Sequence, residues 1–219
     1  VDKTVEAITD LMREAKVKSL DSGVAIPFKS SFMRLIEVPQ VTEKELEKIV
    51  PLEARKYIPV PIEEVSLDWS LVPQVPGMLS EAGNNYINIL LVAVHNDVLS
   101  RFQKITEKTK LENKFLEVES YSSMRSIAPE SNEALMLCDF GASSTKVYVL
   151  YKGFVLVSHV INTGSQDISL NISRSMDMPI DQAEMIKREK GISQKENDEV
   201  AQIIDLTLSQ ITSELIQTK

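Results

Sequence analysis

The feature that most constrains the fold is a run of three apolar segments in quick succession, at residues 134–140, 145–151 and 154–161. Each segment has the length of a strand, and only short turns separate neighbours. Connections this short join adjacent strands as hairpins and leave no room for a crossover helix. The run therefore predicts a series of β-hairpins, in which the first turn, at residues 141–144, consists only of small residues.

That first turn carries more chemistry than a hairpin needs. Its small residues offer bare backbone amides and hydroxyls, and such a turn can approach a phosphate closely. Asp139, at the start of the turn, could hold Mg²⁺ directly or through water. The residues that we expect at a phosphate site are Asp139, Gly141, Ser143, Ser144 and Thr145. An ordinary tight hairpin is the alternative that the turn alone leaves open.

Helical and strand patterns alternate in blocks along the rest of the chain, which favours a mixed α/β or α+β fold. Thr42 and Glu45 form a capping box at the start of one helix, and Pro51 is expected to kink or split that helix. A mobile hairpin loop is predicted at residues 73–85. We expect helices at 5–15, 42–57, 97–112, 122–127, 165–176, 179–190 and 200–215, and further strands at 23–27, 31–38, 63–72, 85–94 and 115–121.

Composition excludes several classes of function. The 219 residues carry a formal net charge of −8 and no block of Lys or Arg, so nucleic acid and anionic membrane surfaces are poor partners. Cys138 is the only cysteine, which rules out an intrachain disulfide and a cysteine zinc site. His95 and His159 stand alone on strand patterns, so neither is expected to bind metal. No apolar stretch reaches the roughly 18–20 residues of a membrane span, so we expect no direct membrane insertion.

The three strands resemble the opening of the second domain in the actin, sugar kinase and heat-shock-chaperone superfamily. There D-x-G-x-x-x-T is the second phosphate-binding loop. The resemblance implies that Gly164, which precedes the next helical pattern, also belongs to the cofactor site. The segment "AEMIK" resembles the A-E-x-x-K helix of the bacterial members. Glu184 and Lys187 lie three residues apart on one helix face. The resemblance implies that this pair touches the ribose or adenine of ATP; a solvated surface pair is the alternative.

A closer resemblance covers nearly the whole chain in the right order. The segment "IEVPQVTEKELEKIVPLEARKYIPVPIEEVSLDWSLV" resembles the type IV pilus assembly protein PilM family, including its E-A-x-x-Y-I-P centre and its acidic–aromatic pair at Asp68 and Trp69. "VESYSSMRSI" resembles the family segment that re-enters the first domain, with Glu119 where aspartate is usual. "NTGSQDISLNISRSMDMPIDQAEMIK" matches the family's glycine-started helix and its A-E-x-x-K helix.

Two departures from the family pattern matter. Residues 1–30 do not supply the first glycine hairpin of the family, and no glycine-rich adenosine loop follows the last helix. The chain begins with Val1, and its first methionine, Met12, falls inside a helical pattern. We therefore expect a central fragment with half of a nucleotide site. Such a fragment would bind ATP weakly or not at all and would be at most a weak ATPase.

The resemblance implies an actin-like α/β fold with parts of domain 1A at residues 1–27 and 115–131, a 1C subdomain at 28–114, and domain 2A with the start of 2B at 132–219. It also implies an ATP- and Mg²⁺-binding scaffold at the inner face of the inner membrane. Its partner would be the cytoplasmic N-terminal peptide of a PilN-like protein, held in the cleft between the 1C subdomain and its neighbour, which "SFMRLIEVP" could line. The scaffold could also self-associate.

Three alternatives remain open. An FtsA-like division protein ends in a basic amphipathic membrane helix, whereas the last helical pattern here is amphipathic but not basic. The cytoplasmic component of a type II secretion system has a similar outline. A sugar kinase would need a catalytic base and a sugar pocket, and we find no motif for either.

Overall fold

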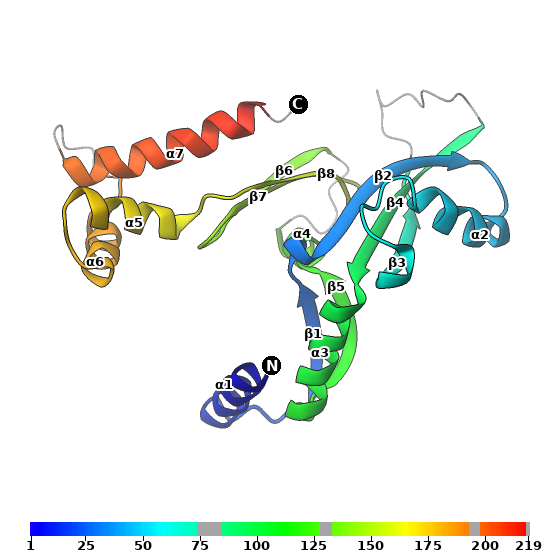
Figure 1. Cartoon of the computed structure of the whole chain (residues 1–219), viewed down its shortest axis with the longest axis horizontal. Coiled ribbons are helices and arrows are strands. Elements are labelled where there is room, and N and C mark those ends of the chain that lie inside the picture. Colours follow the sequence, from blue (N-terminus) through cyan, green and yellow to red (C-terminus); the bar gives the residue numbers. More distant parts are fainter. Residues whose placement is uncertain (74–84, 128–132, 193–197, 218–219) are drawn as a thin grey trace. The chain divides into compact units, whose positions relative to one another are not determined.

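The computed structural model describes residues 1–73, 85–127, 133–192 and 198–217 (Figure 1). Contacts divide the chain into two compact units, residues 1–135 with 149–157 and residues 136–148 with 158–219. The predicted loop at 73–85 lies almost entirely outside the described residues. No helix within the described ranges is long and apolar enough to cross a bilayer.

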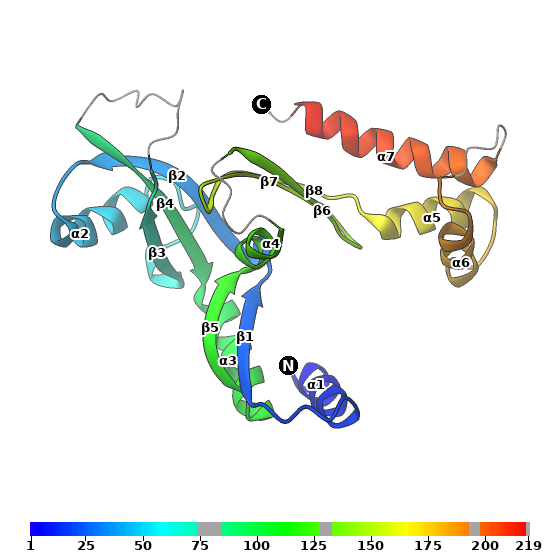
Figure 2. The same cartoon turned by 180° about the vertical axis from the view of Figure 1, so that it is seen from behind.

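The first unit contains two small sheets and the helices that pack on them. Strands β2, β4 and β3 form an antiparallel sheet in that order, and β1 pairs with β5 in parallel. Both views show β1 and β5 side by side with α3 along them (Figures 1 and 2). The elements are α1 (Asp2–Glu14), β1 (Asp21–Ile26), β2 (Ser31–Pro39), α2 (Glu43–Ala54), β3 (Val65–Leu71), β4 (Tyr86–His95), α3 (Asn96–Thr109), β5 (Glu112–Val118) and α4 (Glu119–Ile127).

The main core of this unit lies between α2 and one face of the β2–β4–β3 sheet. Alternation along a strand sends successive side chains to opposite faces. Leu91 and Ala93 of β4 therefore pack toward α2, whereas Val92 and Val94 face the other side. The buried residues of the α2 side are Ile36, Val38, Leu46, Val50, Ala54, Ile58, Val65, Ile89, Leu91 and Ala93.

The predicted capping box of α2 is confirmed: the Glu45 carboxylate accepts the Thr42 backbone N–H at 2.9 Å and the Thr42 hydroxyl at 2.7 Å. Of the predicted kink or split at Pro51, the split is wrong, because the helix runs through Pro51 to Ala54. Val50 and Ala54 on either side are fully buried, so packing holds the helix together despite the lost donor. The helix ends before Tyr57, earlier than predicted.

The three apolar segments form β6 (Leu135–Phe140), β7 (Thr145–Tyr151) and β8 (Phe154–Ile161), within one residue of the predicted bounds. They make one sheet in the order β6–β7–β8. The β7–β8 turn places Lys152 at φ 47° and Gly153 at φ 81°, a left-handed pair that matches the twist of a tight hairpin.

The second unit continues with three helices, α5 (Ser165–Ser175), α6 (Ile180–Lys190) and α7 (Glu199–Gln217). Helix α5 packs against both α6 and α7, and Figures 1 and 2 show α7 beside α5. Pro179 stands just before α6 and Gly191, at φ 56°, just after it, as the sequence predicted. The buried residues between the three helices are Ile168, Ile172, Ala183, Val200 and Ile204.

Several boundaries in the first unit differ from the prediction. Helix α3 ends at Thr109 and not at 112, and β5 begins at Glu112 and not at 115. The strand expected at 115–121 ends at Val118, and Glu119 already begins α4. The Glu119 carboxylate accepts the backbone N–H of Phe28 at 2.7 Å, a contact 91 residues away in sequence. A long-range partner of this kind leaves no trace in local apolar periodicity, so the sequence could not place the start of the helix.

Candidate functional site

The small-residue turn of β6 and β7 is fastened to the start of α5. The Gly141 N–H donates to the Ser144 carbonyl at 3.0 Å and closes the turn. The carbonyls of Gly141 and Ala142 then accept the N–H groups of Ser165 at 3.0 Å and Gln166 at 2.8 Å. These two amides belong to the first turn of α5, where backbone donors lack helical partners. The turn and the helix start therefore form one main-chain structure.

Gly164 makes this approach possible. A Cβ at Gly164 would lie 2.6 Å from the Ala142 carbonyl oxygen and 2.7 Å from that of Gly141. The φ of Gly164 is −147°, an extended value that any residue can adopt. Glycine is therefore needed because there is no space for a Cβ, and not because of its backbone conformation. The Asp167 carboxylate accepts the Gly164 N–H at 2.8 Å and fixes the helix start from inside. We use the name loop–helix site for the turn at residues 141–144, Gly164, the start of α5, and the charged α6 residues at positions 184, 187 and 188.

Thr145 and Asp139, two residues of the predicted phosphate site, contact other residues of the protein. Thr145 is fully buried, and its hydroxyl donates to the Thr163 carbonyl at 2.9 Å. The Asp139 carboxylate lies 3.3 Å from the Lys146 ammonium, with 38% of the Asp139 side chain exposed. A cation bound at Asp139 would compete with Lys146 for this carboxylate. No three His, Cys, Asp or Glu side chains of the described residues gather in a way that could hold a metal ion.

The residues present fit a phosphate. Ala142 and Ser143 are exposed at the turn, and within the described ranges their backbone N–H groups donate to no protein acceptor. Two neighbouring amides of this kind, with a serine hydroxyl beside them, suit an anionic oxygen. Ser144 is buried, so it contributes to the turn through its carbonyl.

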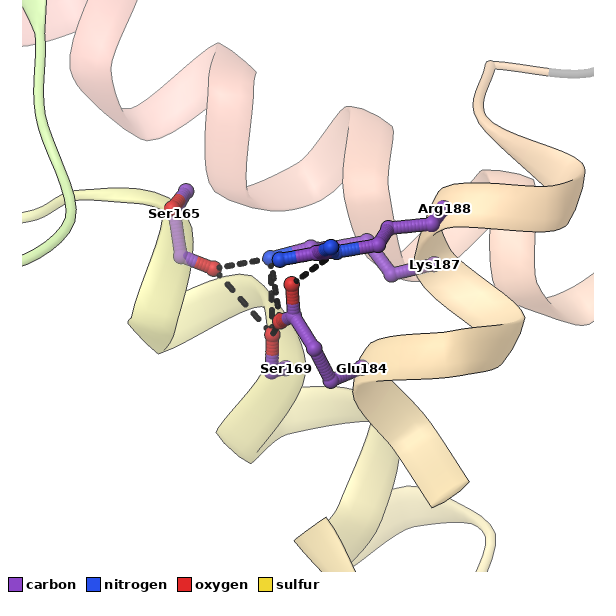
Figure 3. Close-up of polar contacts among 5 residues, drawn as sticks. All are labelled: Ser165, Ser169, Glu184, Lys187 and Arg188. Atoms are coloured by element: carbon purple, nitrogen blue, oxygen red, sulfur yellow. Dashed lines mark hydrogen bonds and ion pairs between the residues drawn. The ribbon is translucent and has the colours of Figure 1, made fainter. Parts of the chain in front are cut away.

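Helix α6 brings three charged side chains onto α5 (Figure 3). The Lys187 ammonium donates to the Ser165 carbonyl at 3.0 Å and to the Ser169 hydroxyl at 2.9 Å, and it lies 2.6 Å from the Glu184 carboxylate. The Ser169 hydroxyl donates to Glu184 at 2.5 Å. Arg188 approaches the other Glu184 oxygen at 2.8 Å. The structure thus brings Glu184 and Lys187 together with the helix that starts at the turn.

This network sets the charge of Glu184. The Lys187 ammonium, the Ser169 hydroxyl and the Arg188 guanidinium hold the pKa of Glu184 at about 2, below its usual 4.5. Only 14% of the Lys187 side chain is exposed, so its charge is shielded from water by the helices. The carboxylate therefore stays ionised at neutral pH and keeps both acceptor oxygens engaged.

An open cavity of about 530 Å³ lies on this surface. Sequence reasoning missed three of its polar residues, Ser165, Ser169 and Arg188. The signal was present, because Ser165 and Ser169 are four apart on one helix face, as are Glu184 and Arg188. The cavity is lined by Ala142, Ser165, Gln166, Ser169, Leu170, Ile180, Asp181, Glu184 and Arg188.

The first unit carries a second concavity of about 340 Å³, which we call the β3 groove. It lies on the face of the sheet opposite α2. Strand β3 contributes Ser66, Asp68 and Ser70 to that face, since they pair with Val94, Val92 and Leu90 of β4. The residues lining the groove include Ile26, Ser66, Leu67, Asp68, Trp69, Ser70, Val92, Val94, Leu99, Leu116, Glu117, Val118 and Tyr121.

The segment "SFMRLIEVP", which we expected as a possible wall of a slot, forms β2 at the opposite edge of the sheet from β3. Its inward side chains Ile36 and Val38 are 3% and 0% exposed and belong to the α2 core. Met33, on the other face, accepts the Ser120 hydroxyl at its sulfur at 3.7 Å. None of these β2 residues lines the β3 groove.

Comparison with known proteins places these features in context. The chain is 23% identical to the cell division protein FtsA of Neisseria meningitidis, over 99% of this chain and 58% of that protein. It is similar to a solved PilM–PilN type IV pilus biogenesis complex, with a TM-score of 0.80 and 24% identity over 99% of this chain and 62% of that one. MreB 5 of Spiroplasma citri, solved with AMPPNP, is similar over 57% of this chain, with 15% identity and a TM-score of 0.50, covering 47% of that chain.

These likenesses confirm the predicted actin-like α/β fold. The chain spans only about three fifths of the length of the first two relatives. The family described as type IV pilus assembly protein PilM matches residues 1–216, almost the whole chain. The chain therefore belongs to the PilM family of type IV pilus assembly proteins.

Proposed function

We propose that the chain acts as a scaffold that recruits the cytoplasmic N-terminal peptide of a PilN-like inner-membrane protein. The observation that carries the proposal is the β3 groove, an apolar concavity beside a strand edge. The solved relative with PilM and PilN together supports the choice of partner class. The PilM-family match supports pilus assembly as the setting.

The β3 groove suits an extended peptide. A peptide that lies along β3 gains main-chain hydrogen bonds from the strand edge, while its apolar side chains enter the groove. Each fully buried anchor would contribute about 1.5–3 kcal/mol before the costs of ordering. Because apolar burial supplies most of this affinity, binding should survive high salt, unlike a contact made only of surface charge.

In this proposal residues 28–114 are a 1C subdomain, residues 1–27 and 115–131 belong to 1A, and residues 132–219 are 2A with the start of 2B. The scaffold would work at the cytoplasmic face of the inner membrane, held there by its partner. The scaffold would contact the pilus complex through that partner. Self-association of the scaffold would let one assembly hold several PilN-like peptides.

The test is a titration of the cognate PilN-like N-terminal peptide into the chain and into the full-length gene product, at low and at high salt. We expect saturable binding to both, tighter for the full-length product. No binding to the full-length product would reject the proposal. Preference for a division protein's peptide would instead favour an FtsA-like role, which the 23% identity to FtsA makes the second candidate.

We further propose that the loop–helix site holds ATP in the full-length protein. The exposed amides of Ala142 and Ser143 would receive phosphate oxygens, Asp139 would hold Mg²⁺, and Glu184 with Lys187 would face the ribose or adenine. Support comes from the likeness to MreB 5, which was solved with AMPPNP. ATP would supply a negatively charged ligand that fastens the turn, α5 and α6 together.

Asp139→Asn in the full-length product tests this second proposal. We expect the affinity for MgATP to fall about tenfold or more, because a metal ligand loses its charge. Thermal stability should change little, because the Asp139–Lys146 pair is partly exposed and such pairs contribute about 0–1 kcal/mol. Unchanged MgATP affinity, or unfolding of the variant, would favour a purely structural role for Asp139.

A further inference from the structure

Strand β3 is an edge strand of its sheet. In the described part of the sheet it pairs only with β4. The N–H of Val72, the residue after β3, donates to the carbonyl of Asn88 in β4 at 2.9 Å. Because main-chain groups alternate in direction along an antiparallel strand, the peptide groups of Leu67, Trp69 and Leu71 point away from β4. This edge lies beside the β3 groove.

One of these outward donors already has an internal acceptor. The Trp69 N–H donates to the Asp68 carboxylate at 2.9 Å. Asp68 thus covers the edge donor of the next residue with its own side chain. Charged side chains at sheet edges are a known protection against unwanted strand pairing. A strand that adds to β3 must take the Trp69 N–H away from Asp68.

Asp68 also gives the β3 groove its unbalanced charge. The other carboxylate that lines the groove, Glu117, is held by Arg125 and by the Ser122 hydroxyl. Asp68 has no cationic partner within ion-pair distance among the described residues. Burial raises the pKa of Tyr121 to about 12, and the nearby Asp68 carboxylate adds to that rise. The Asp68 charge is therefore felt inside the groove.

We infer that Asp68 selects a strand-forming segment that carries a lysine or arginine next to its apolar anchors. On binding, the Trp69 N–H passes to a carbonyl of the incoming segment, and the freed Asp68 carboxylate accepts the segment's cationic side chain. This inference rests on the proposed function and names the chemistry of its partner. The cytoplasmic flanks of membrane proteins are enriched in Lys and Arg, so a peptide from such a flank can supply the cation.

The experiment is a double-mutant cycle on the chain. The two probes are the cognate PilN-like N-terminal peptide and the same peptide with every Lys and Arg replaced by Gln, both acetylated so that side chains are their only cations. The two proteins are the parent chain and Asp68→Asn. The amide of asparagine still accepts the Trp69 N–H but carries no charge. Trp69 is the only tryptophan of the chain, so its fluorescence reports binding at the edge itself.

We expect Asp68→Asn to weaken the parent peptide about five- to tenfold and the neutral peptide less than about twofold, with the difference shrinking as salt is added. Glu47→Gln is the matched control, because it removes an exposed carboxylate from α2 on the opposite face of the sheet. It should change neither affinity.

Equal losses for both peptides would overturn the inference while leaving the proposed function intact. Absence of saturable binding of the parent peptide to the parent chain would reject both. A second measurement tests the exchange of hydrogen-bond partners. Bound peptide should slow hydrogen exchange at the Trp69 amide in both the parent chain and Asp68→Ala, since the new acceptor comes from the peptide. If the Trp69 amide exchanges equally fast with and without peptide, no strand is added at β3 and the inference fails.

Discussion

In the loop–helix site, main-chain groups contact main-chain groups, whereas in the β3 groove apolar side chains lie beside a strand edge. The carbonyls of residues 141 and 142 accept hydrogen bonds from the first N–H groups of α5, and Glu184 forms ion pairs with Lys187 and Arg188. The β3 groove instead keeps a carboxylate without an ion-pair partner among the described residues. The first arrangement presents fixed main-chain donors and suits a ligand with anionic oxygens; the second presents apolar walls beside a strand edge and suits an extended chain. The two sites should consequently fail in different ways when they are altered.

The largest expected effect is a loss of stability when a side chain is added at Gly164. Gly164→Ala would place a Cβ 2.6 Å from the Ala142 carbonyl oxygen, and neither backbone can yield without losing the bonds to Ser165 and Gln166. We expect a loss of about 1–3 kcal/mol in the free energy of unfolding, typical of overpacking. Urea denaturation of the chain measures it.

Gly23→Ala is the matched control in the first unit. The new Cβ there would meet the Phe115 ring at 2.1 Å, a closer approach than at Gly164. Phe115 is 54% exposed, so its ring can rotate into solvent. We expect a smaller loss than for Gly164→Ala. If the two variants lose the same stability, the main-chain contact at Gly164 is no harder to adjust than the side-chain contact at Gly23.

A smaller effect, on peptide affinity, is expected when an apolar side chain of the β3 groove is truncated. Leu116 lines it and is 40% exposed, so truncation costs little of the core. Leu116→Ala should weaken the cognate PilN-like peptide by about 1 kcal/mol through lost apolar burial, with little change in unfolding. Leu52→Ala, at a 60% exposed position on α2, is the control. Peptide affinity that falls equally in both variants would remove the β3 groove from the binding surface.

The sequence predicted the two regions unequally, for physical reasons. The strands around the loop–helix site were predicted within one residue, because turn chemistry at Gly141 and Gly153 acts over a few residues. The A-E-x-x-K pair was also placed on the correct helix face. The resemblance implied a cleft beside the 1C subdomain, but the residues of the β3 groove were not predicted, because the groove joins β1, β3, β4 and β5, which are distant in sequence. Local periodicity tells which β2 side chains share a face, but not which edge of the sheet stays open.

The smallest effect concerns the charge of Glu184. Its pKa of about 2 in the folded chain is below the 4.5 of an unperturbed glutamate. The unfolded chain therefore takes up this proton first as the pH falls. The stability contributed by the network is fully present above about pH 4.5 and is lost as the pH falls toward about 2. Within that window the free energy of unfolding should rise with pH, and in Glu184→Gln this part of the slope should be missing.

Urea midpoints of the parent chain and Glu184→Gln across that window measure the difference. The effect should be modest, because 34% of the Glu184 side chain is exposed and solvent screens its partners. Glu189→Gln on the same helix is the control, since Glu189 is exposed and forms no ion pair within the described ranges. If Glu189→Gln flattens the slope as much as Glu184→Gln, the acid response belongs to the net charge of the chain. If only Glu184→Gln does, α6 is held on α5 by a charged network, in contrast to the apolar β3 groove.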